Sequence, residues 1–412
     1  MSEWKKCPIG EVVTLRQGFA INAKSKHYMS KEETSLPLLR IADMKNGTKE
    51  VFVKEEIPQR FIAHPEDIIY TRTGNVGLVF RNNYGVMHNN CFSVTPNDAD
   101  ELSRDFLYYA LQNKTFFDTA NALARGAAQP DLPHTSFNSI EFAYPSLFVQ
   151  HRIANILSRY DSLIENYQKQ IKLLEEAAQR LYKEWFVDLH FPGHEKTNII
   201  DGVPEGWEKK KLHEIAEVVM GSSPKSEFYN NDKQGLPFHQ GVGSYGTRFV
   251  DDNVYSTSIT RLAEPNSILF SVRAPVGRLN ITKNKIIIGR GLAAMNHKDG
   301  FQSFLFYMLK ERFFMDNIIG NGSIFASISK VELLDQEFIV PPMKTIMAFE
   351  SLASKLDKKI QGVDTQLRLL TEARDRLLPK LMSGELTLEA RAEKEDLLAT
   401  PCKRGWEEDE AK

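Results

Sequence analysis

Two long stretches of the chain carry apolar residues at an alternating spacing of four and three. This spacing is a heptad seam, typical of a helix that packs along one partner helix rather than one with a broad apolar face. Charged residues fill the positions between, so we expect the two stretches to pair with each other. The first seam is Tyr160, Ile164, Tyr167, Ile171, Leu174, Ala178, Leu181 and Trp185; the second is Leu356, Ile360, Val363, Leu367, Leu370, Leu377 and Leu381, interrupted at Arg374.

Outside the two seams, short runs of β-branched and aromatic residues dominate. Examples are 37–41, 67–71 and 285–289, whereas helical periodicity is confined to about 104–118 and 301–317. This mixture predicts an α+β fold in which a twisted, mainly antiparallel sheet is joined by a few helices.

The chain repeats itself, in a fixed order of blocks, at a slowly drifting offset. Residues 4–18 match 207–221 at an offset of 203, and 68–77 match 268–277 at 200. Further on, 106–111 match 304–309 at 198, and the helix starts match at 196. Small loop insertions in a duplicated unit produce such a drift, so we predict two equivalent globular domains, each followed by one long helix.

The predicted organisation has six parts: a first globular domain at 1–149, a first spacer helix at 150–188, a linker at 189–206, a second globular domain at 207–345, a second spacer helix at 346–386 and a polar tail at 387–412. Connectivity favours an antiparallel coiled coil with one globular domain at each end, related by a pseudo-twofold axis. About 30 helical residues would separate the domains by roughly 45 Å, somewhat more than one turn of B-DNA.

Composition is ordinary for a globular protein, and no apolar run is long enough to predict a membrane helix. Three widely separated cysteines indicate neither a disulfide framework nor a metal site, which favours a reducing, cytoplasmic location.

Net charge is close to neutral, but its distribution is uneven. The 28 residues from Glu385 onward hold nine acidic and five basic residues, so the rest of the chain carries about +2. Two windows contain no acid: 265–298, with six basic residues, and 68–97, with Arg72 and Arg81. Such windows are typical of a surface that faces phosphates. The alternative is that the basic residues protect solvated strand edges and bind nothing.

Two pairs of glycine-containing loops carry the donors that a DNA reader needs. Arginine can bind guanine, and asparagine or glutamine can bind adenine, through paired hydrogen bonds. The alternative is that these turns simply close hairpins. The candidate DNA-binding residues are Arg40, Arg72, Thr73, Asn75, Arg125 and Gln129 in the first domain, and Gln240, Arg273, Arg290, Ser323 and Phe325 in the second.

Motifs for catalysis are weak by comparison. Residues 241–246 fit GxGxxG, yet a strand-and-turn pattern follows where a dinucleotide site needs a helix. His190 and His194 have no further ligand nearby. The matched acids Asp161 and Asp357 lie on charged helix faces and are interpreted as surface or capping residues. We therefore predict no catalytic centre and no metal site in this chain.

Several segments together resemble the specificity subunit of type I restriction-modification systems, over nearly the whole chain. They are 70–77 (YTRTGNVG), 145–150 (PSLFVQ), 181–188 (LYKEWFVD), 204–207 (PEGW) and 377–386 (LLPKLMSGEL). The chain departs from the family pattern at Ile346, which stands where the first repeat has Gln150; this leaves the contacts at the start of the second helix open.

The resemblance implies two target-recognition domains that each read half of a split, asymmetric sequence in double-stranded DNA. It also implies that the helices fix the gap and dock two methyltransferase subunits, through Gln150 and the seam residues. S-adenosylmethionine, ATP and Mg would be bound by the methyltransferase and endonuclease/translocase subunits, and no cofactor by this chain.

Two other functions compete with this interpretation. One is a single-chain DNA methyltransferase or nuclease that carries two recognition domains, which would require a cofactor or metal motif. The other is a scaffold whose coiled coil gathers proteins, which would show no preference for one bipartite duplex.

Overall fold

The computed structural model describes residues 4–126, 128–313 and 327–386. The chain divides into two compact units: unit 1 comprises residues 1–165 and 368–412, and unit 2 comprises residues 166–367. Each unit therefore contains one globular domain and parts of both long helices. The predicted tail, 387–412, lies outside the described residues.

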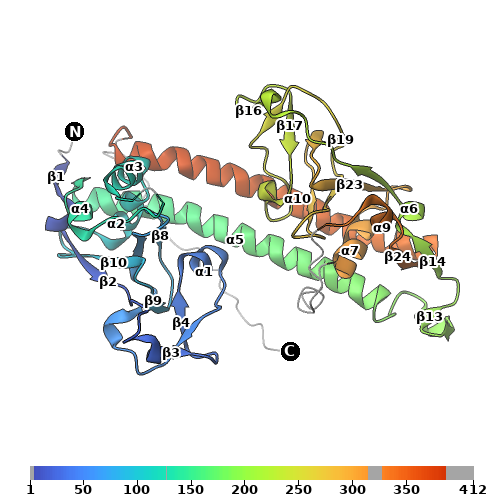
Figure 1. The fold of residues 1–412 in the computed structure, drawn as a ribbon, viewed down its shortest axis with the longest axis horizontal. Coiled ribbons are helices and arrows are strands. Elements are labelled where there is room, and N and C mark those ends of the chain that lie inside the picture. The colour runs from blue at the N-terminus through green and yellow to red at the C-terminus, as the bar shows by residue number, and fades with distance from the viewer. Residues whose placement is uncertain (1–3, 127, 314–326, 387–412) are drawn as a thin grey trace, which may run out of the picture. The chain divides into compact units, whose positions relative to one another are not determined.

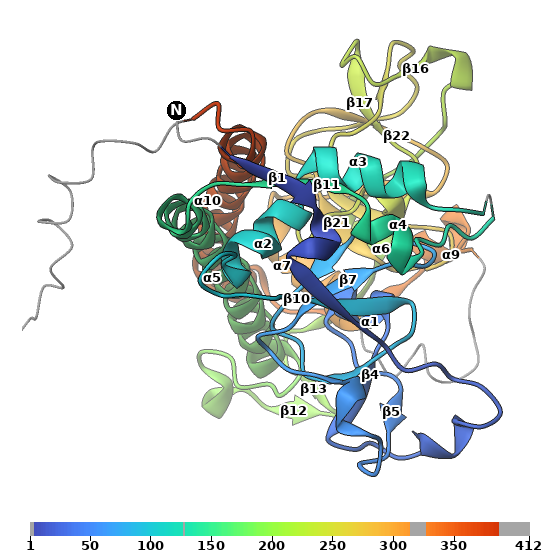
Figure 2. The same cartoon turned by 90° about the vertical axis from the view of Figure 1, so that its left-hand side faces the viewer.

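Unit 1 contains three small sheets (Figure 1). A four-stranded antiparallel sheet has the order β2-β10-β7-β8, and a five-stranded sheet has the order β3-β5-β4-β9-β6 with one parallel pair, β4 with β9. The pair β1 and β11 forms the third sheet (Figure 2). The strands are β1 (Lys5–Pro8), β2 (Val13–Gln17), β3 (Met29–Ser30), β4 (Leu36–Leu39), β5 (Phe52–Val53), β6 (Ile62–Ala63), β7 (Ile68–Thr71), β8 (Val79–Phe80), β9 (Gly85–Met87), β10 (Cys91–Pro96) and β11 (Glu141–Tyr144).

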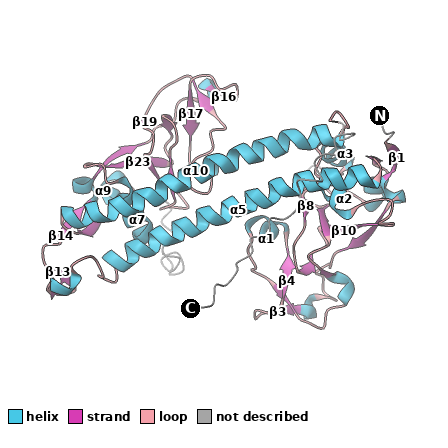
Figure 3. Cartoon of the chain, turned by 180° about the vertical axis from the view of Figure 1, so that it is seen from behind, coloured by secondary structure: helices cyan, strands magenta, loops and turns pink. Residues whose placement is uncertain are grey.

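Unit 2 repeats these sheets strand for strand. Figure 3 labels β14, β16, β17, β19 and β23 of this unit. The orders are β15-β23-β20-β21, β16-β18-β17-β22-β19 with β17 and β22 parallel, and β14-β24. The strands are β14 (Glu208–Lys211), β15 (Ala216–Met220), β16 (Tyr229–Asn230), β17 (Leu236–His239), β18 (Tyr255–Ser256), β19 (Leu262–Ala263), β20 (Ile268–Ser271), β21 (Leu279–Ile281), β22 (Ile286–Ile288), β23 (Leu292–His297) and β24 (Glu337–Val340).

The sequence prediction found too few helices. The apolar period at 104–118 belongs to two helices. Gln112 caps the C-terminal end of the first, and Asn113 caps the N-terminal end of the second. The predicted linker also holds a hairpin, β12 (Ile199–Ile200) and β13 (Val203–Pro204), turned by Asp201 and Gly202 at positive φ. The helices of the globular parts are α1 (Ile41–Asn46), α2 (Arg104–Leu111), α3 (Lys114–Leu123), α4 (His134–Asn138), α6 (Leu212–Ile215), α7 (Gln302–Phe313) and α9 (Lys330–Leu334).

The two spacer helices are α5 (Leu147–Phe186) and α10 (Met343–Met382). They begin before Gln150 and Ile346, the predicted starts. Pro145 follows β11 and Pro342 follows β24, so a proline stands just ahead of each helix, where it is tolerated. They also end earlier than predicted, at Phe186 and Met382. Within each unit the segments of α5 and α10 run antiparallel, as predicted.

The heptad seam lies inside the two cores. In unit 1, Leu377 and Leu381 of α10 pack with α5 and the sheet residues Tyr70 and Phe92. In unit 2, Ile171 of α5 and Ile360 of α10 join a core built on α7. The helices are thus an integral part of both hydrophobic cores and do not form an independent spacer.

Candidate nucleic-acid interface

In unit 1 the two predicted recognition loops lie side by side. Isolated backbone bridges join Thr73 and Arg125 to Asp131, and Gly74 N donates to Pro130 O. Gly74 has φ +82°, a conformation that suits glycine at the tip of the turn. The side chains of Asn75, Arg125 and Gln129 are exposed around this junction. Residues separated by about 50 positions in sequence therefore form one surface.

Arg72 is held firmly at this surface. Its Nε and Nη2 donate to the Oδ1 and Oδ2 atoms of Asp131 at 3.2 and 2.6 Å, and Nη1 donates to Gln17 Oε1 at 3.2 Å. Thr73 Oγ1 also donates to Asp131, at 2.6 Å. Burial opposes ionisation of Asp131, but these hydrogen bonds outweigh it and hold the pKa of its carboxyl below the usual value. Three of the five guanidinium N–H groups are used, which leaves one on each terminal nitrogen for a further acceptor.

Arg40 is less available than the sequence suggested. It follows β4, and its guanidinium pairs with Asp43 and with Glu50, each at 2.6 Å. The hydrogen bonds that Arg40 donates to Asp43 and Glu50 raise the pKa of this already basic group. Any contact of Arg40 with DNA would have to compete with two carboxylates.

In unit 2 the equivalent loop presents its arginine differently. Val272 takes the position of Arg72 and is buried, while Arg273 is exposed and bridges through its backbone to Ser327. Ser327 occupies the position of Asp131, so this arginine has no carboxylate buttress there. Ser323 and Phe325, the other predicted residues of this surface, lie outside the described residues.

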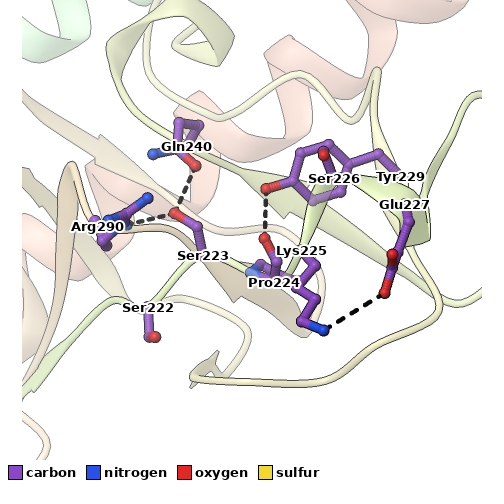
Figure 4. A pocket seen from close by; sticks show the side chains of 9 residues that line it. All are labelled: Ser222, Ser223, Pro224, Lys225, Ser226, Glu227, Tyr229, Gln240 and Arg290. Atoms are coloured by element: carbon purple, nitrogen blue, oxygen red, sulfur yellow. Dashed lines mark hydrogen bonds and ion pairs between the residues drawn. The ribbon is translucent and has the colours of Figure 1, made fainter.

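Gln240 and Arg290 line a pocket in unit 2 (Figure 4). The pocket has a volume of about 810 Å³ and is formed by the segment Ser222–Glu227 with Tyr229, Gln240 and Arg290. Ser223 joins the two predicted residues, because its hydroxyl donates to Gln240 Oε1 and accepts from Arg290 N. Both residues are exposed at the pocket.

Asp161 and Asp357 are not the surface or capping acids that the sequence suggested. Asp161 accepts from Tyr109 Oη at 2.6 Å and pairs with Arg81 and Arg374. Its contact with Arg374, at 3.1 Å, explains the arginine that interrupts the second seam. Arg81 stacks on Tyr108 at 4.1 Å, so this member of an acid-free window turns inward rather than toward phosphates.

The same junction exists in unit 2 with an arginine from another segment. Asp357 accepts from Tyr307 Oη at 2.8 Å and from Arg248 Nη2 at 2.7 Å, and Arg248 lies over the Phe306 ring at 3.6 Å. In both units an acid of a spacer helix therefore holds the globular domain through a tyrosine and an arginine. The matched spacing of the acids was the available sequence signal, but their partners could not be identified from it.

A second pair of helix contacts was also missed. Gln150 is fully buried; its Oε1 accepts from Ser103 N at the start of α2, and its Nε2 donates to the carbonyls of Glu101 and Pro145. In unit 2 the start of α7 is held instead by Glu350, which accepts from Ser303 N and Phe304 N. Ile346, at the Gln150 position, joins the core. Gln150 is thus a structural residue within unit 1, which corrects its placement among partner-binding residues.

The other predicted partner-binding residues also face inward. Ile164, Ile171, Ile360 and Val363 are almost completely buried, and the remainder are partly buried, most of them against the cores. The seam therefore packs the chain onto itself. Apolar side chains that the helices do expose are Phe148, Leu163, Leu173, Met343, Met347, Leu352 and Leu369.

The part of the chain that the structure describes contains no group of three or more His, Cys, Asp or Glu side chains placed to hold a metal ion. Among those same residues, none of the helices is both long and apolar enough to cross a membrane.

Comparison with known proteins connects this architecture to a family. The model of the type I restriction modification DNA specificity domain matches the chain twice, at residues 1–176 and 204–362. The chain belongs to the type I restriction-modification specificity family. The two matches coincide with the duplicated globular parts, so each unit carries one specificity domain.

Individual relatives agree with this assignment. The chain is 30% identical to the type I restriction enzyme MjaIX specificity subunit of Methanocaldococcus jannaschii over 315 residues, 72% of each chain. It is 24% identical to the MjaVIII specificity subunit of the same organism over 410 residues, 93% of each chain. The crystal structure of the S subunit of a type I restriction-modification system from M. genitalium has the same fold, with a TM-score of 0.58 and 20% identity over 92% of this chain and 96% of that one.

Proposed function

We propose that this specificity subunit directs a type I restriction-modification complex to a bipartite, asymmetric sequence in double-stranded DNA, with one half-site read by each unit. The observation that carries the proposal is the double match to the specificity domain on two units with the same strand order. The loops of the two units carry different side chains, such as Arg72 in unit 1 and Arg273, one position later in the repeat, in unit 2. The two half-sites should therefore differ as well.

The same proposal assigns catalysis to other subunits. Two methyltransferase subunits bind S-adenosylmethionine, and endonuclease/translocase subunits use ATP and Mg, while this chain binds no cofactor and acts in the cytoplasm. The exposed apolar residues of α5 and α10 suit partner docking, because such side chains are favoured in the centre of protein interfaces. Leu163 and Leu369 offer such a surface in unit 1, and Met343 and Met347 in unit 2.

The direct test is to express the chain with its methyltransferase subunits and to map every methylated base in the host DNA. We expect methylation at one split sequence with a fixed gap, absent when this chain is omitted. A continuous recognition sequence, or methylation that persists without the chain, would contradict the proposal. Incubating the purified chain alone with DNA, S-adenosylmethionine and Mg should give no modification; activity there would favour a single-chain enzyme.

The helices are proposed to set the gap. Inserting one heptad into α5 and one into α10 preserves the seam and lengthens each helix by about 10 Å, which corresponds to roughly 3 base pairs. The mapped gap should grow by that amount while both half-sites stay the same. An unchanged gap would show that the helices do not determine it.

A further inference from the structure

The pocket at Gln240 and Arg290 is assembled from three separate segments that backbone contacts fix in place. Ser222 N donates to Ile288 O, and Thr260 Oγ1 donates to Ser222 O. Gly221 approaches Gly289 so closely that a Cβ at Gly221 would lie 2.1 Å from Gly289 O. The absence of a side chain at Gly221 is therefore what allows the Ser222–Glu227 segment to pack against β22. The pocket is a built feature of the unit rather than a gap between loose loops.

Ser223 determines which polar atoms face the pocket. Its hydroxyl donates its one proton to Gln240 Oε1 at 2.7 Å and accepts from Arg290 N at 3.1 Å. With Oε1 engaged, the amide of Gln240 offers its NH2 group, which is a donor. Figure 4 shows Ser223 next to both Gln240 and Arg290, with a dashed line to each. Ser223 is thus a positioning residue that makes the pocket rich in donors.

The charge of the pocket is positive. No described carboxylate forms an ion pair with the Arg290 guanidinium, which is exposed. Lys225 and Glu227 stand 3.8 Å apart with side chains 82% and 64% exposed, so their pairing is weak and screened by solvent. Elsewhere in the acid-free window, Lys283 and Lys285 are neutralised by Asp364 and Glu264. A donor-rich pocket with one unpaired arginine suits an anionic ligand with several acceptor oxygens.

We propose that this pocket seats a backbone phosphate of the DNA duplex and anchors unit 2 to DNA independently of sequence. The inference rests on the proposed function. The concave shape of the pocket favours a phosphate over a base. Phosphates project from the duplex and can enter a concave site, whereas base edges lie at the floor of a groove and are reached by protruding side chains. Arginine, hydroxyl and amide donors are the groups that commonly bind such phosphates.

The matching positions of unit 1 carry different chemistry. The positions of Ser222 and Ser223 are taken by Phe19 and Ala20, and Phe19 is buried against Phe61 with ring centroids 5.3 Å apart. Arg40, at the Gln240 position, is neutralised by two carboxylates. Asn89 stands where unit 2 has Arg290. The anchor is therefore a property of unit 2, and we expect it to contribute unequally to the two halves of the complex.

The test uses the full complex with its methyltransferase subunits and the duplex whose sequence has been mapped by methylation. Arg290→Ala should lower the association constant by roughly tenfold for this duplex and for a duplex with a substituted half-site alike. The slope of log K against log salt should become shallower by about 0.9, the value for one phosphate. Ser223→Ala should weaken binding in the same uniform way, and Arg290→Lys should restore most of the slope.

Two controls separate this effect from general electrostatics and from misfolding. Arg312→Ala, on the exposed face of α7, removes the same charge outside the pocket and should leave the slope unchanged. Asn89→Ala makes the substitution at the matching position of unit 1 and should also have no effect. Thermal unfolding of each variant establishes that the complex remains folded.

Three results would overturn the proposal: an unchanged slope for Arg290→Ala, an equal change for Arg312→Ala, or loss of discrimination at one base pair, which would make Arg290 a base reader. These failures differ from failure of the proposed function, in which the unaltered complex itself shows no sequence preference.

Discussion

Unit 1 and unit 2 hold their globular domains to the spacer helices with the same chemistry but with arginines from different segments. Arg81 directly follows β8, and the matching position after the duplication is Ile281, at the end of β21. In unit 2 a neighbouring strand segment pairs with Ile281 and supplies Arg248 instead. The arrangement of tyrosine, arginine and helix carboxylate persists while its sequence source has changed, which indicates that the junction itself, rather than the individual arginine, is required by the fold.

The exposed loops of the two units show the opposite behaviour. Their backbones match closely: Arg72 N and Val272 N donate to equivalent carbonyls, Asn90 O and Gly291 O. Their side chains differ in charge, exposure and partners. Packing therefore restricts the inward contacts of each unit, whereas the outward side chains are free to diverge, as expected of two domains that read different half-sites.

The largest expected effect concerns the junction acid of unit 2. Asp357→Ala removes the closest carboxylate of Arg248, whose side chain is 2% exposed, and leaves this arginine with Glu175 at 3.5 Å. The free energy of unfolding should fall by about 3–4 kcal/mol. Asp161→Ala should cost less, about 1–3 kcal/mol, because Arg81 is 23% exposed and can regain water. Denaturant unfolding of both variants measures this difference. Equal losses would show that burial of the arginine does not govern the strength of the junction.

Next in size is the division of DNA recognition between the loops. Arg72→Ala should weaken discrimination by about 1–3 kcal/mol at one half-site, and Arg273→Ala should do so at the other. Binding of the full complex to duplexes substituted in one half-site at a time measures both effects. If either variant acted equally on both half-sites, or on neither, the assignment of these loops would be wrong.

A smaller effect is expected from Asp131, which buttresses the first loop and whose position in unit 2 is taken by Ser327. Asp131→Ala frees Arg72 and Thr73 and should destabilise unit 1 by about 1 kcal/mol. Because the pKa of Asp131 is lowered on folding, its contribution is present above the pKa that this carboxyl has in the unfolded chain and is lost as pH falls through the lower, folded value. Unfolding measured between about pH 2 and 7 should show this loss in the wild type and not in the variant. Ser327→Ala, at the matching position of unit 2, is the control and should show no pH-dependent difference.

The smallest effect concerns Glu350, which holds the start of α7 in unit 2 as Gln150 holds the start of α2 in unit 1. Burial raises the pKa of the Glu350 carboxyl, so the folded protein retains this proton over a range where the unfolded chain has lost it. Stability from this group is therefore full below the unfolded pKa and falls as pH rises through the folded one. Glu350→Gln should remove this decline and gain up to about 1 kcal/mol relative to wild type as pH rises from 4 to 8. A difference between the two proteins that does not vary with pH would show that the carboxyl does not titrate in this way.

Much of the fold could be predicted from the sequence because it depends on periodic patterns. The heptad spacing from Tyr160 to Trp185 predicted a helix over these residues and its buried face, since both follow from local geometry. The small helices α1, α6 and α9 were missed because each has at most six residues, too few for an apolar period to be visible. Asp161 and Asp357 were misinterpreted for a related reason: a carboxylate on a charged helix looks the same in sequence whether it faces solvent or an arginine.

By itself, the sequence determined the duplication, the two long helices and the α+β class, because repeats and hydrophobic periods are properties of the chain alone. Only the tertiary structure decided which polar groups are engaged. It turned Arg81 inward and Arg273 outward, gave Arg72 an acidic buttress from a loop about 60 residues away, and joined Ser223, Gln240 and Arg290 in one pocket. The physical reason is that hydrogen bonds and ion pairs depend on distance in space, which long-range packing sets and local sequence does not encode.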